Sequence, residues 1–388
     1  MLLDLRHATN RPDERVLDAA DALRALEVLG HARPILLAYS PPTTSPFYAL
    51  LYSRAVECGI APIPVRSIAD TADLIPIAAV GGARVVLHLH WLNRVLDRVT
   101  DPAEAARRVV AFEAALDRLI DQGVAIVWTV HNILPHLARL PDAEFSVRRA
   151  VVERASAIHV MAAATEALMS PHMRLPADRL VRVPHPSFRG LYPDLVDRAH
   201  ARSVLGLAPS APAVGLVGSL QPYKGLTELL DALPAAAARR PGIRLVVAGR
   251  PGADPESAAA IECAVADPRV LAHPRHVPDD QLQVVLRGVD AVVLPYRRVL
   301  NSATLMLALE FDRPLVFPRD PALLEFADPA VAVTYDRGSP EALAGAMDQA
   351  LDLPTDAVGE AARRLREARD PAVLSRAFAA ALRERLGE

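Results

Sequence analysis

The stretch AVGLVGSLQPYKGLTELLDAL, residues 213–233, joins an apolar run to a helical pattern through a turn. The apolar run ends at Gly218, and after Lys224 and a glycine the leucines recur at helical spacing. A lysine at a helix start adds a cation where backbone N–H groups already favour anions. A phosphate-binding loop is therefore one interpretation of the turn, but by itself the turn slightly favours the other, a loop that carries a solvated lysine.

Eight apolar runs of this kind alternate with helical patterns along the chain. They cover residues 33–39, 83–91, 124–130 and 156–161 in the first half and 212–218, 243–249, 289–296 and 313–318 in the second. Continuous apolar runs suit parallel strands that are buried on both faces. The alternation of strands and helices then predicts an α/β protein with two Rossmann-like, doubly wound parallel sheets.

A stretch rich in proline and small residues, 183–213, separates the two halves. We expect an N-terminal domain over residues 1–190 and a C-terminal domain over residues 191–370. Whether the helical pattern over 371–388 packs back on the first domain stays open at this point. A length of 388 residues agrees with two domains.

Composition and charge narrow the functional classes. No apolar run reaches the ~18 uncharged residues of a membrane helix, and the first residues lack the pattern of a signal peptide. A net charge of -3 shows no excess of basic residues of the kind that binds nucleic acid. The two distant cysteines, Cys58 and Cys263, predict reduced thiols. We therefore expect a cytoplasmic protein that binds no nucleic acid.

Four segments of the second half follow predicted strands, where open α/β sheets bind their ligands. The candidate binding residues are Gly218, Ser219 and Lys224 in GSLQPYKG, Gly249 and Arg250 in AGRPG, His276 and Val277 in RHVPDD, and Arg297, Asn301, Ser302, Ala303 and Thr304 in PYRRVLNSAT. The turn at Lys224 matches neither of the common nucleotide motifs, G-x-x-x-x-G-K-[ST] and G-x-G-x-x-G. The segments thus favour a bound diphosphate over the hydrolysis of a nucleoside triphosphate.

The order and spacing of these segments over 212–318 resemble the donor half of GT-B glycosyltransferases, most closely glycosyltransferase family 4 and related bacterial exopolysaccharide mannosyltransferases. The resemblance implies two parallel sheets that face each other across a cleft, with a nucleotide-sugar bound by the C-terminal domain. It also implies that Lys224 contacts the donor diphosphate and that the backbone at His276 and Val277 meets the base. Residues 301–304 would cradle the distal phosphate.

Two positions depart from that family pattern. Many members carry an arginine shortly before the lysine, where this chain has Gln221, so Arg297 is the candidate that restores the charge. Many also carry two glutamates at positions that correspond here to Val299 and Leu307, and Glu310 is the only nearby carboxylate. Retention of the anomeric configuration therefore does not follow from the resemblance.

Histidines follow two predicted strands of the first half, in HLHWLN (88–93) and WTVHNILPH (128–136). The resemblance of TVHN…PH to the family implies that His131 faces the sugar, as a contact or as a base for the acceptor hydroxyl. His90 and His136 are further candidates for acceptor binding, and so is Tyr48, as a ring that stacks on a sugar. A helix that packs Phe47 and its neighbours into the core explains the Tyr48 segment equally well.

A metal site is the alternative for these histidines, because His88, His90, His131 and His136 could converge. No cysteine or carboxylate stands at ligand spacing beside them, and the chain has no Asp-x-Asp tripeptide for a diphosphate-bound cation. The sequence therefore predicts no metal and no cofactor, with Lys224 and helix-start amides stabilising the leaving group.

The function expected from the sequence is transfer of a hexosyl group from GDP-mannose or a UDP-hexose to a saccharide, lipid-linked or natural-product acceptor. His131 and Lys224 are the expected catalytic residues. Peripheral association with the inner membrane face and the oligomeric state stay open. One alternative is a protein of the same fold that binds a nucleotide-sugar or acts as a scaffold without transfer. Another is a nucleotide-sugar epimerase or a pseudo-glycosyltransferase.

Overall fold

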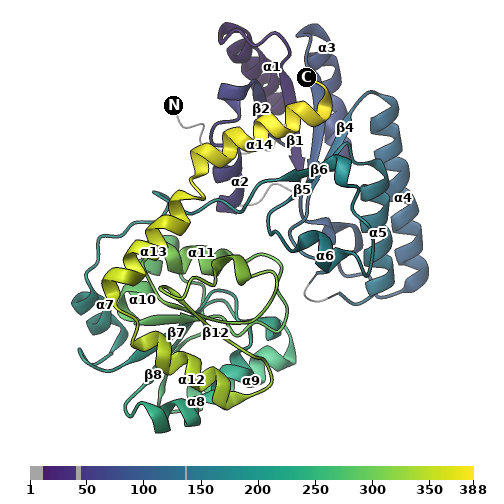
Figure 1. Ribbon diagram of the computed structural model, residues 1–388. Coiled ribbons are helices and arrows are strands. Elements are labelled where there is room, and N and C mark those ends of the chain that lie inside the picture. The colour runs from purple at the N-terminus through teal and green to yellow at the C-terminus, as the bar shows by residue number, and fades with distance from the viewer. Residues whose placement is uncertain (1–11, 41–44, 136–137) are drawn as a thin grey trace. The chain divides into compact units, whose positions relative to one another are not determined.

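The computed structural model describes residues 12–40, 45–135 and 138–388 and contains two compact α/β units (Figure 1). One unit comprises the residues up to Pro186 together with Pro371–Glu388, and the other comprises Ser187–Asp370. Each unit is built on a parallel sheet of six strands. The predicted class, α/β with two Rossmann-like parallel sheets, is confirmed.

In the first unit the strand order is β2-β1-β3-β4-β5-β6. The strands are β1 (Ile35–Ser40), β2 (Ile60–Pro64), β3 (Arg84–Leu89), β4 (Ala125–Thr129), β5 (Ala157–Val160) and β6 (Leu180–Arg182). The helices are α1 (Pro12–Val28), α2 (Pro46–Leu51), α3 (Ile75–Val80), α4 (Pro102–Asp121), α5 (Pro141–Arg154), α6 (Thr165–Met169) and α14 (Pro371–Leu386). Leu374, Phe378 and Leu382 of α14 are buried in the core of this unit with strand residues such as Val86 and Val127.

In the second unit the order is β12-β11-β10-β7-β8-β9. The strands are β7 (Ala213–Val217), β8 (Arg244–Ala248), β9 (Val270–His273), β10 (Ala291–Val293), β11 (Leu315–Pro318) and β12 (Ala332–Tyr335). The helices are α7 (Arg198–Leu205), α8 (Leu226–Arg239), α9 (Pro255–Ala266), α10 (Leu282–Gly288), α11 (Ala303–Glu310), α12 (Pro340–Leu351) and α13 (Thr355–Glu367). The leucine face of α8 packs on β7 and β8 in one core cluster.

Each sheet has one point where the strand order reverses. The reversal lies between β1 and β3 in the first unit and between β7 and β10 in the second. At such a point the loops after the two strands diverge, and the carboxyl edge of the sheet opens into a crevice that commonly holds a ligand. The loops after β3 and β4 carry His90 and His131, and the loop after β7 carries Lys224.

All eight predicted strands are present, and the described residues form four further strands that were not predicted. The missed strands are β2, β6, β9 and β12, and each forms an edge of its sheet. Each of these strands includes half-buried or exposed residues, as in β12, whose two middle residues are half-buried. An edge strand has one neighbour, so it needs no continuous apolar run.

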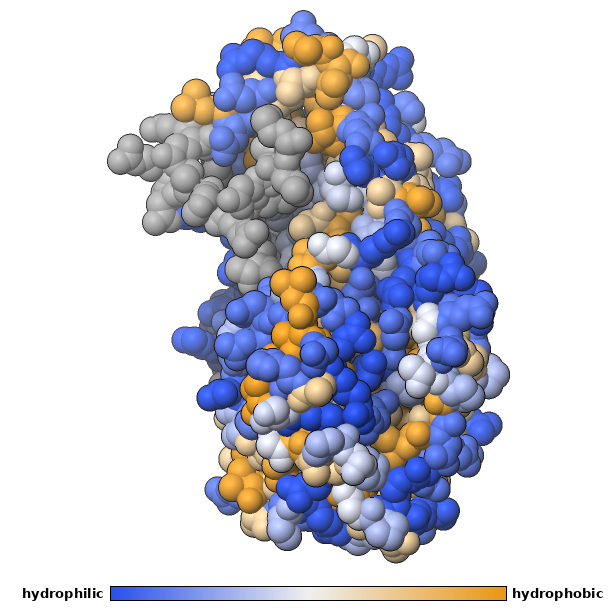
Figure 2. Space-filling view, turned by 90° about the vertical axis from the view of Figure 1, so that its left-hand side faces the viewer, coloured by the Kyte–Doolittle hydropathy of each residue, from blue (hydrophilic) through white to orange (hydrophobic). Residues whose placement is uncertain are grey.

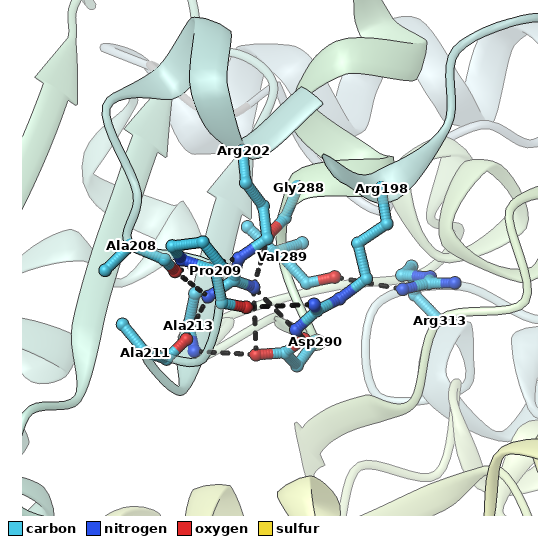
Figure 3. A network of polar contacts seen from close by, with 10 residues as sticks. All are labelled: Arg198, Arg202, Ala208, Pro209, Ala211, Ala213, Gly288, Val289, Asp290 and Arg313. Carbon is cyan, nitrogen blue, oxygen red and sulfur yellow. Dashed lines mark hydrogen bonds and ion pairs between the residues drawn. The ribbon is translucent and has the colours of Figure 1, made fainter. Parts of the chain in front are cut away.

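A polar network closes the amino-terminal edge of the second sheet, opposite the expected ligand edge (Figure 3). The Asp290 carboxylate accepts hydrogen bonds from the Ala213 amide at 2.9 Å, from Arg198 at 2.7 Å and from Arg202 at 3.3 Å. The Arg202 side chain is 1% exposed and also donates to the carbonyl groups of Ala208 and Gly288. The network thus ties α7 to the starts of β7 and β10.

Replacing Asp290 with alanine is expected to destabilise the second unit by about 3 kcal/mol, because buried Arg202 would lose its carboxylate partner. Calorimetric unfolding measures the effect. Asp352→Ala is a matched control in the same unit, since Asp352 is 66% exposed and its pair with Arg240 is worth about 0–1 kcal/mol. Equal losses in the two variants would contradict a structural role for the network.

None of the helices within residues 12–40, 45–135 and 138–388 combines the length and the apolar character needed to cross a bilayer. On the face shown in Figure 2, hydrophilic residues prevail and hydrophobic residues gather only in small separate groups.

Candidate functional site

The loop after β7 and the loop after β10 meet around Lys224. The chain leaves β7 at Gly218 and makes a 3₁₀ turn over Pro222–Lys224 before α8. A backbone hydrogen bond of 2.9 Å from Arg297 to the Tyr223 carbonyl group joins the two loops. The predicted loop of the sequence analysis therefore lies at the reversal point of the sheet, with its lysine turned toward the loop after β10.

Lys224 is held by hydroxyl groups. Its Nζ donates to Tyr296 Oη and to Thr304 Oγ1, both at 3.1 Å, and it lies 4.7 Å from the centroid of the Tyr296 ring. Burial alone lowers the pKa of the ammonium, but the phenolic oxygens of Tyr296 and Tyr223 raise it by more. The pKa therefore lies above the ordinary lysine value, and Lys224 is a buried cation at neutral pH.

No carboxylate among the described residues forms an ion pair with Lys224, so its charge is available to an anionic ligand. A side chain at Gly218 would place its Cβ 3.2 Å from Thr304 Oγ1 and 3.8 Å from Lys224 Nζ, so glycine keeps the space beside the ammonium open. Lys224 is also the only lysine in the sequence. A buried cation beside an open space is the arrangement expected of a phosphate site.

The remaining predicted residues of the second unit lie along the same edge of the sheet. Gly249 packs directly on Gly218, because a Cβ at Gly249 would lie 1.5 Å from the Gly218 carbonyl oxygen. Ser219 is half-buried in the loop after β7, and Arg250 is exposed after β8. His276 is exposed and Val277 half-buried in the loop after β9, the strand beside β8.

The segment 301–304 forms the start of α11, as the sequence predicts. Ser302 is the N-cap, and its hydroxyl accepts the Leu305 amide at 3.1 Å and lies 2.7 Å from Tyr296 Oη. Thr304 is buried against Lys224, Ala303 is exposed and Asn301 is half-buried. Tyr296 was not among the predicted residues, although it stands in the quoted segment between the end of β10 and Arg297.

The structure corrects the expected role of Arg297. Its guanidinium group forms ion pairs with Glu228 of α8 and Glu256 of α9, so its charge is already balanced within the second unit. An arginine held by two carboxylates has little charge left for a diphosphate. Glu310, the only nearby carboxylate in the sequence, lies in the last turn of α11, at the end away from Ser302 and Thr304.

In the first unit, buried histidines follow one another across the sheet. Hydrogen bonds join His131 Nε2 to His90 Nδ1 at 2.9 Å, His90 Nε2 to Tyr52 Oη at 2.8 Å and Tyr52 Oη to His88 Nδ1 at 2.8 Å. His88 Nε2 lies 2.7 Å from Thr129 Oγ1, which lies 3.0 Å from His159 Nδ1. We call these six residues the histidine chain. Phe378 of α14 stacks on His88 and lies beside His159.

Three members of the histidine chain, His88, His90 and His131, are among the residues considered from the sequence, whereas Tyr52, Thr129 and His159 are not. His159 lies in the predicted strand SAIHVM (156–161), and its parallel pairing with Thr129 brings the two side chains together. His90 is 1% exposed, and its two ring nitrogens are hydrogen-bonded to Tyr52 and His131. The expectation that His90 itself contacts an acceptor is therefore corrected: His90 is buried and hydrogen-bonded to His131.

The structure also corrects the role of Tyr48, which is 3% exposed. Its ring stacks on Tyr52 and packs on Tyr39, because α2 turns its aromatic face into the core. The ring has no free face for a sugar. Trp91 stacks on His131 instead, with the ring centroids 4.0 Å apart. His136 lies outside the described residues.

Burial keeps the histidine chain neutral. It lowers the pKa of His88, His90 and His131 well below the usual histidine value, and charges on neighbouring histidines would lower each further. Burial also lowers the pKa of His159 to about 4. Among the described residues, no group of histidine, cysteine or carboxylate side chains is arranged to hold a metal ion. The ring nitrogens of His88 and His90 are instead joined to Tyr52, Thr129 and His131.

The first unit is expected to lose stability as the pH falls from about 6.5 toward 4. A folded-state pKa below the unfolded value means that the unfolded chain binds more protons in this window. His159 alone, with a pKa of about 4, accounts for about 3 kcal/mol. Urea unfolding followed by tryptophan fluorescence measures this unit, since it holds both tryptophans, Trp91 and Trp128. Equal stability at pH 7 and pH 5 would contradict the burial of neutral histidines.

Comparison with known proteins adds a family match and relatives of named activity. Residues 211–352 match the family described as "Glycosyl transferases group 1". The chain is 29% identical over 278 residues to the GDP-mannose:glycolipid 4-beta-D-mannosyltransferase of Xanthomonas campestris pv. campestris. The matched region covers 69% of this chain and 72% of that protein. It is 35% identical over 151 residues to the D-inositol 3-phosphate glycosyltransferase of Segniliparus rotundus, over 37% of this chain and 33% of that protein.

Solved structures share the fold at low sequence identity. The Anabaena Alr3699/HepE protein in complex with UDP and glucose superposes with a TM-score of 0.63 at 16% identity, over 90% of this chain and all of that one. The sucrose-phosphate synthase of Thermosynechococcus elongatus gives a TM-score of 0.65 at 15% identity, over 92% of this chain and 99% of that one. These likenesses assign the GT-B fold to the chain.

Proposed function

This chain is a GT-B glycosyltransferase that uses a sugar nucleotide, and from that premise we propose that it transfers mannose from GDP-mannose to a hydroxyl group of a lipid-linked saccharide. The buried Lys224 cation beside Gly218 carries the proposal, because it offers an uncompensated charge at the reversal point of the sheet. The Xanthomonas relative supports this donor and this class of acceptor through its name. Membership of family 4 stays a prediction.

The second unit would hold the donor. The Lys224 ammonium would contact the diphosphate, and the amides at the start of α11 would face the distal phosphate. When the bond between the sugar C1 and the diphosphate oxygen breaks, that oxygen gains negative charge. Lys224 would stabilise this charge, which is why we propose that transfer needs no bound metal ion.

The first unit would activate the acceptor. His131 is half-buried at the outer end of the histidine chain, and its neutral ring would accept the proton of the acceptor hydroxyl. The hydroxyl oxygen then forms the new bond to C1 as the bond to GDP breaks. Such a direct displacement inverts the configuration at C1.

Incubation with a panel of nucleotide-sugars tests the proposal. We expect GDP, and less so UDP, to raise the temperature of unfolding of the second unit. We expect release of GDP from GDP-mannose to require a saccharide-lipid acceptor and to continue in the presence of EDTA. Stabilisation by GDP without release in any acceptor mixture would favour the alternative of a binding protein, and no stabilisation by any nucleotide would contradict both functions.

A lipid-linked acceptor would bring the enzyme to a membrane surface. The protein is then expected to sediment with vesicles that contain the glycolipid acceptor and to stay in solution with vesicles of the same phospholipids alone.

A further inference from the structure

The histidine chain ends at a group that can only accept a hydrogen bond. The Nε2 atom of His159 lies 2.8 Å from the carbonyl oxygen of Val183, which follows β6. A carbonyl oxygen has no proton to give, so His159 Nε2 must carry one and donate it. This fixed end sets the direction of every other hydrogen bond in the histidine chain.

A neutral imidazole has one N–H group and one lone pair. Since His159 carries its proton on Nε2, its Nδ1 must accept, and Thr129 Oγ1 donates to it over 3.0 Å. The Thr129 hydroxyl has a single proton, so it must accept from His88 Nε2 over 2.7 Å. His88 therefore also carries its proton on Nε2.

The same alternation continues to the outer end. His88 Nδ1 accepts from Tyr52, whose oxygen accepts from His90 Nε2, both over 2.8 Å. His90 Nδ1 then accepts from His131 Nε2 over 2.9 Å. Every donor has one acceptor, and no proton is shared or missing.

We propose that the Val183 carbonyl group, acting through the histidine chain, fixes His131 in the tautomer with its proton on Nε2, so that Nδ1 is the atom that accepts a proton. The tautomer of His131 follows from the hydrogen bonds alone. The identity of the proton donor, the acceptor hydroxyl, rests on the proposed function. His159, Thr129, His88, Tyr52 and His90 are then positioning residues, which act through His131.

Two physical arguments exclude other arrangements. The reverse order would place the lone pair of His159 Nε2 against the Val183 oxygen at 2.8 Å, where two acceptors repel. A second proton on His88, His90 or His159 would break the alternation, and burial disfavours each such charge.

The inner end of the histidine chain also has a low affinity for an additional proton. With a pKa of about 4, His159 is protonated in only about one molecule in a thousand at pH 7. A proton taken up by His131 therefore does not come to rest at the inner end, and the function of the histidine chain is orientation.

Nitrogen NMR of the full chain labelled with ¹⁵N-histidine reads the tautomer directly. At pH 7, in the absence of substrate, we expect the proton of the His131 ring on Nε2 and an unprotonated Nδ1. The signals are assigned by their loss in His131→Gln. A proton on Nδ1 of His131 in the wild-type protein would overturn the proposal.

Thr129→Val interrupts the histidine chain with almost no change of shape. We expect signals of the other His131 tautomer to appear and the transfer rate to fall in proportion to the remaining Nε2–H fraction, with the KM for the donor unchanged. Tyr52→Phe should act in the same way at another link, which keeps the test valid if one variant folds poorly. Thr129→Ser restores the hydroxyl and should restore both readouts.

Thr165→Val is the matched control, because Thr165 is a fully buried threonine of the same unit that donates to the Ala162 carbonyl group outside the histidine chain. It should change neither readout. An unchanged His131 tautomer in both Thr129→Val and Tyr52→Phe would also overturn the proposal. If the wild-type protein shows the Nε2–H tautomer but transfers no sugar, the proposed function fails and the proposed tautomer stands.

Discussion

His131→Ala is expected to lower the rate of sugar transfer by about 10²–10⁴-fold, the usual contribution of a positioned general base. The acceptor hydroxyl would keep its proton during attack, so the new bond to C1 would form at a higher energy. Affinity for the nucleotide should stay within about twofold, because Lys224 and its partners lie in the other unit. Single-turnover rates with GDP-mannose and calorimetric titration with GDP measure the two quantities separately.

A second substitution separates chemistry from stability. In His131→Gln the side-chain amide can still donate to His90, so the unfolding of the first unit should change little while the rate falls as in His131→Ala. His172→Ala is the control, since His172 is exposed and stacks only on Phe145 among the rings of this unit that the structure describes. A His131→Gln enzyme with wild-type rates would rule out a base at this position.

Lys224→Met is expected to weaken GDP binding by about 30–1000-fold, or roughly 2–4 kcal/mol, because a charge-assisted contact with the diphosphate disappears. Methionine keeps the length and the apolar contacts of the side chain, so the loss reports the charge. The wild-type affinity should also fall as the salt concentration rises, and the affinity of the variant should respond less. Calorimetric titration with GDP measures both.

Because the sequence contains a single lysine, modification of side-chain amines reports on Lys224 alone. Every side-chain adduct of an amine-reactive reagent must be on Lys224, so mass spectrometry can follow its modification alone. GDP should protect Lys224 from the reagent. Arg239→Met is the matched control for binding, because Arg239 is an exposed cation at the opposite end of α8. Equal affinity in Lys224→Met and Arg239→Met would remove Lys224 from the donor site.

The sequence predicts the interior of each sheet better than its edges. Strands such as β1 and β8 are covered by neighbours and helices, and burial on all sides leaves a continuous apolar run. The strand β2, by contrast, reads Ile60–Pro64 with two prolines, which only an edge strand tolerates. Such a segment has no pattern that separates it from a loop until its partner strand is known.

In the candidate site, features set by neighbouring residues in the sequence can be predicted, whereas contacts between distant residues cannot. Lys224 follows from its place between a strand and a helix, a relation within a few residues. The ion pairs of Arg297 with Glu228 and Glu256 depend on residues 69 and 41 positions away, which no local pattern reveals. The link from His88 to His159 through Thr129 likewise requires the pairing of three strands.

The helix α14 has a consequence for the order of events during synthesis. It follows the whole second unit in the sequence, yet its Leu374, Phe378 and Leu382 complete the core of the first. On the ribosome, the second unit can thus finish folding while the first still waits for the helix that covers His88 and His159. A chain that stops before Pro371 would keep Lys224 and its hydroxyl partners but leave the histidines uncovered. On the proposed function, a chain that ends before Pro371 would bind nucleotide but would not activate an acceptor.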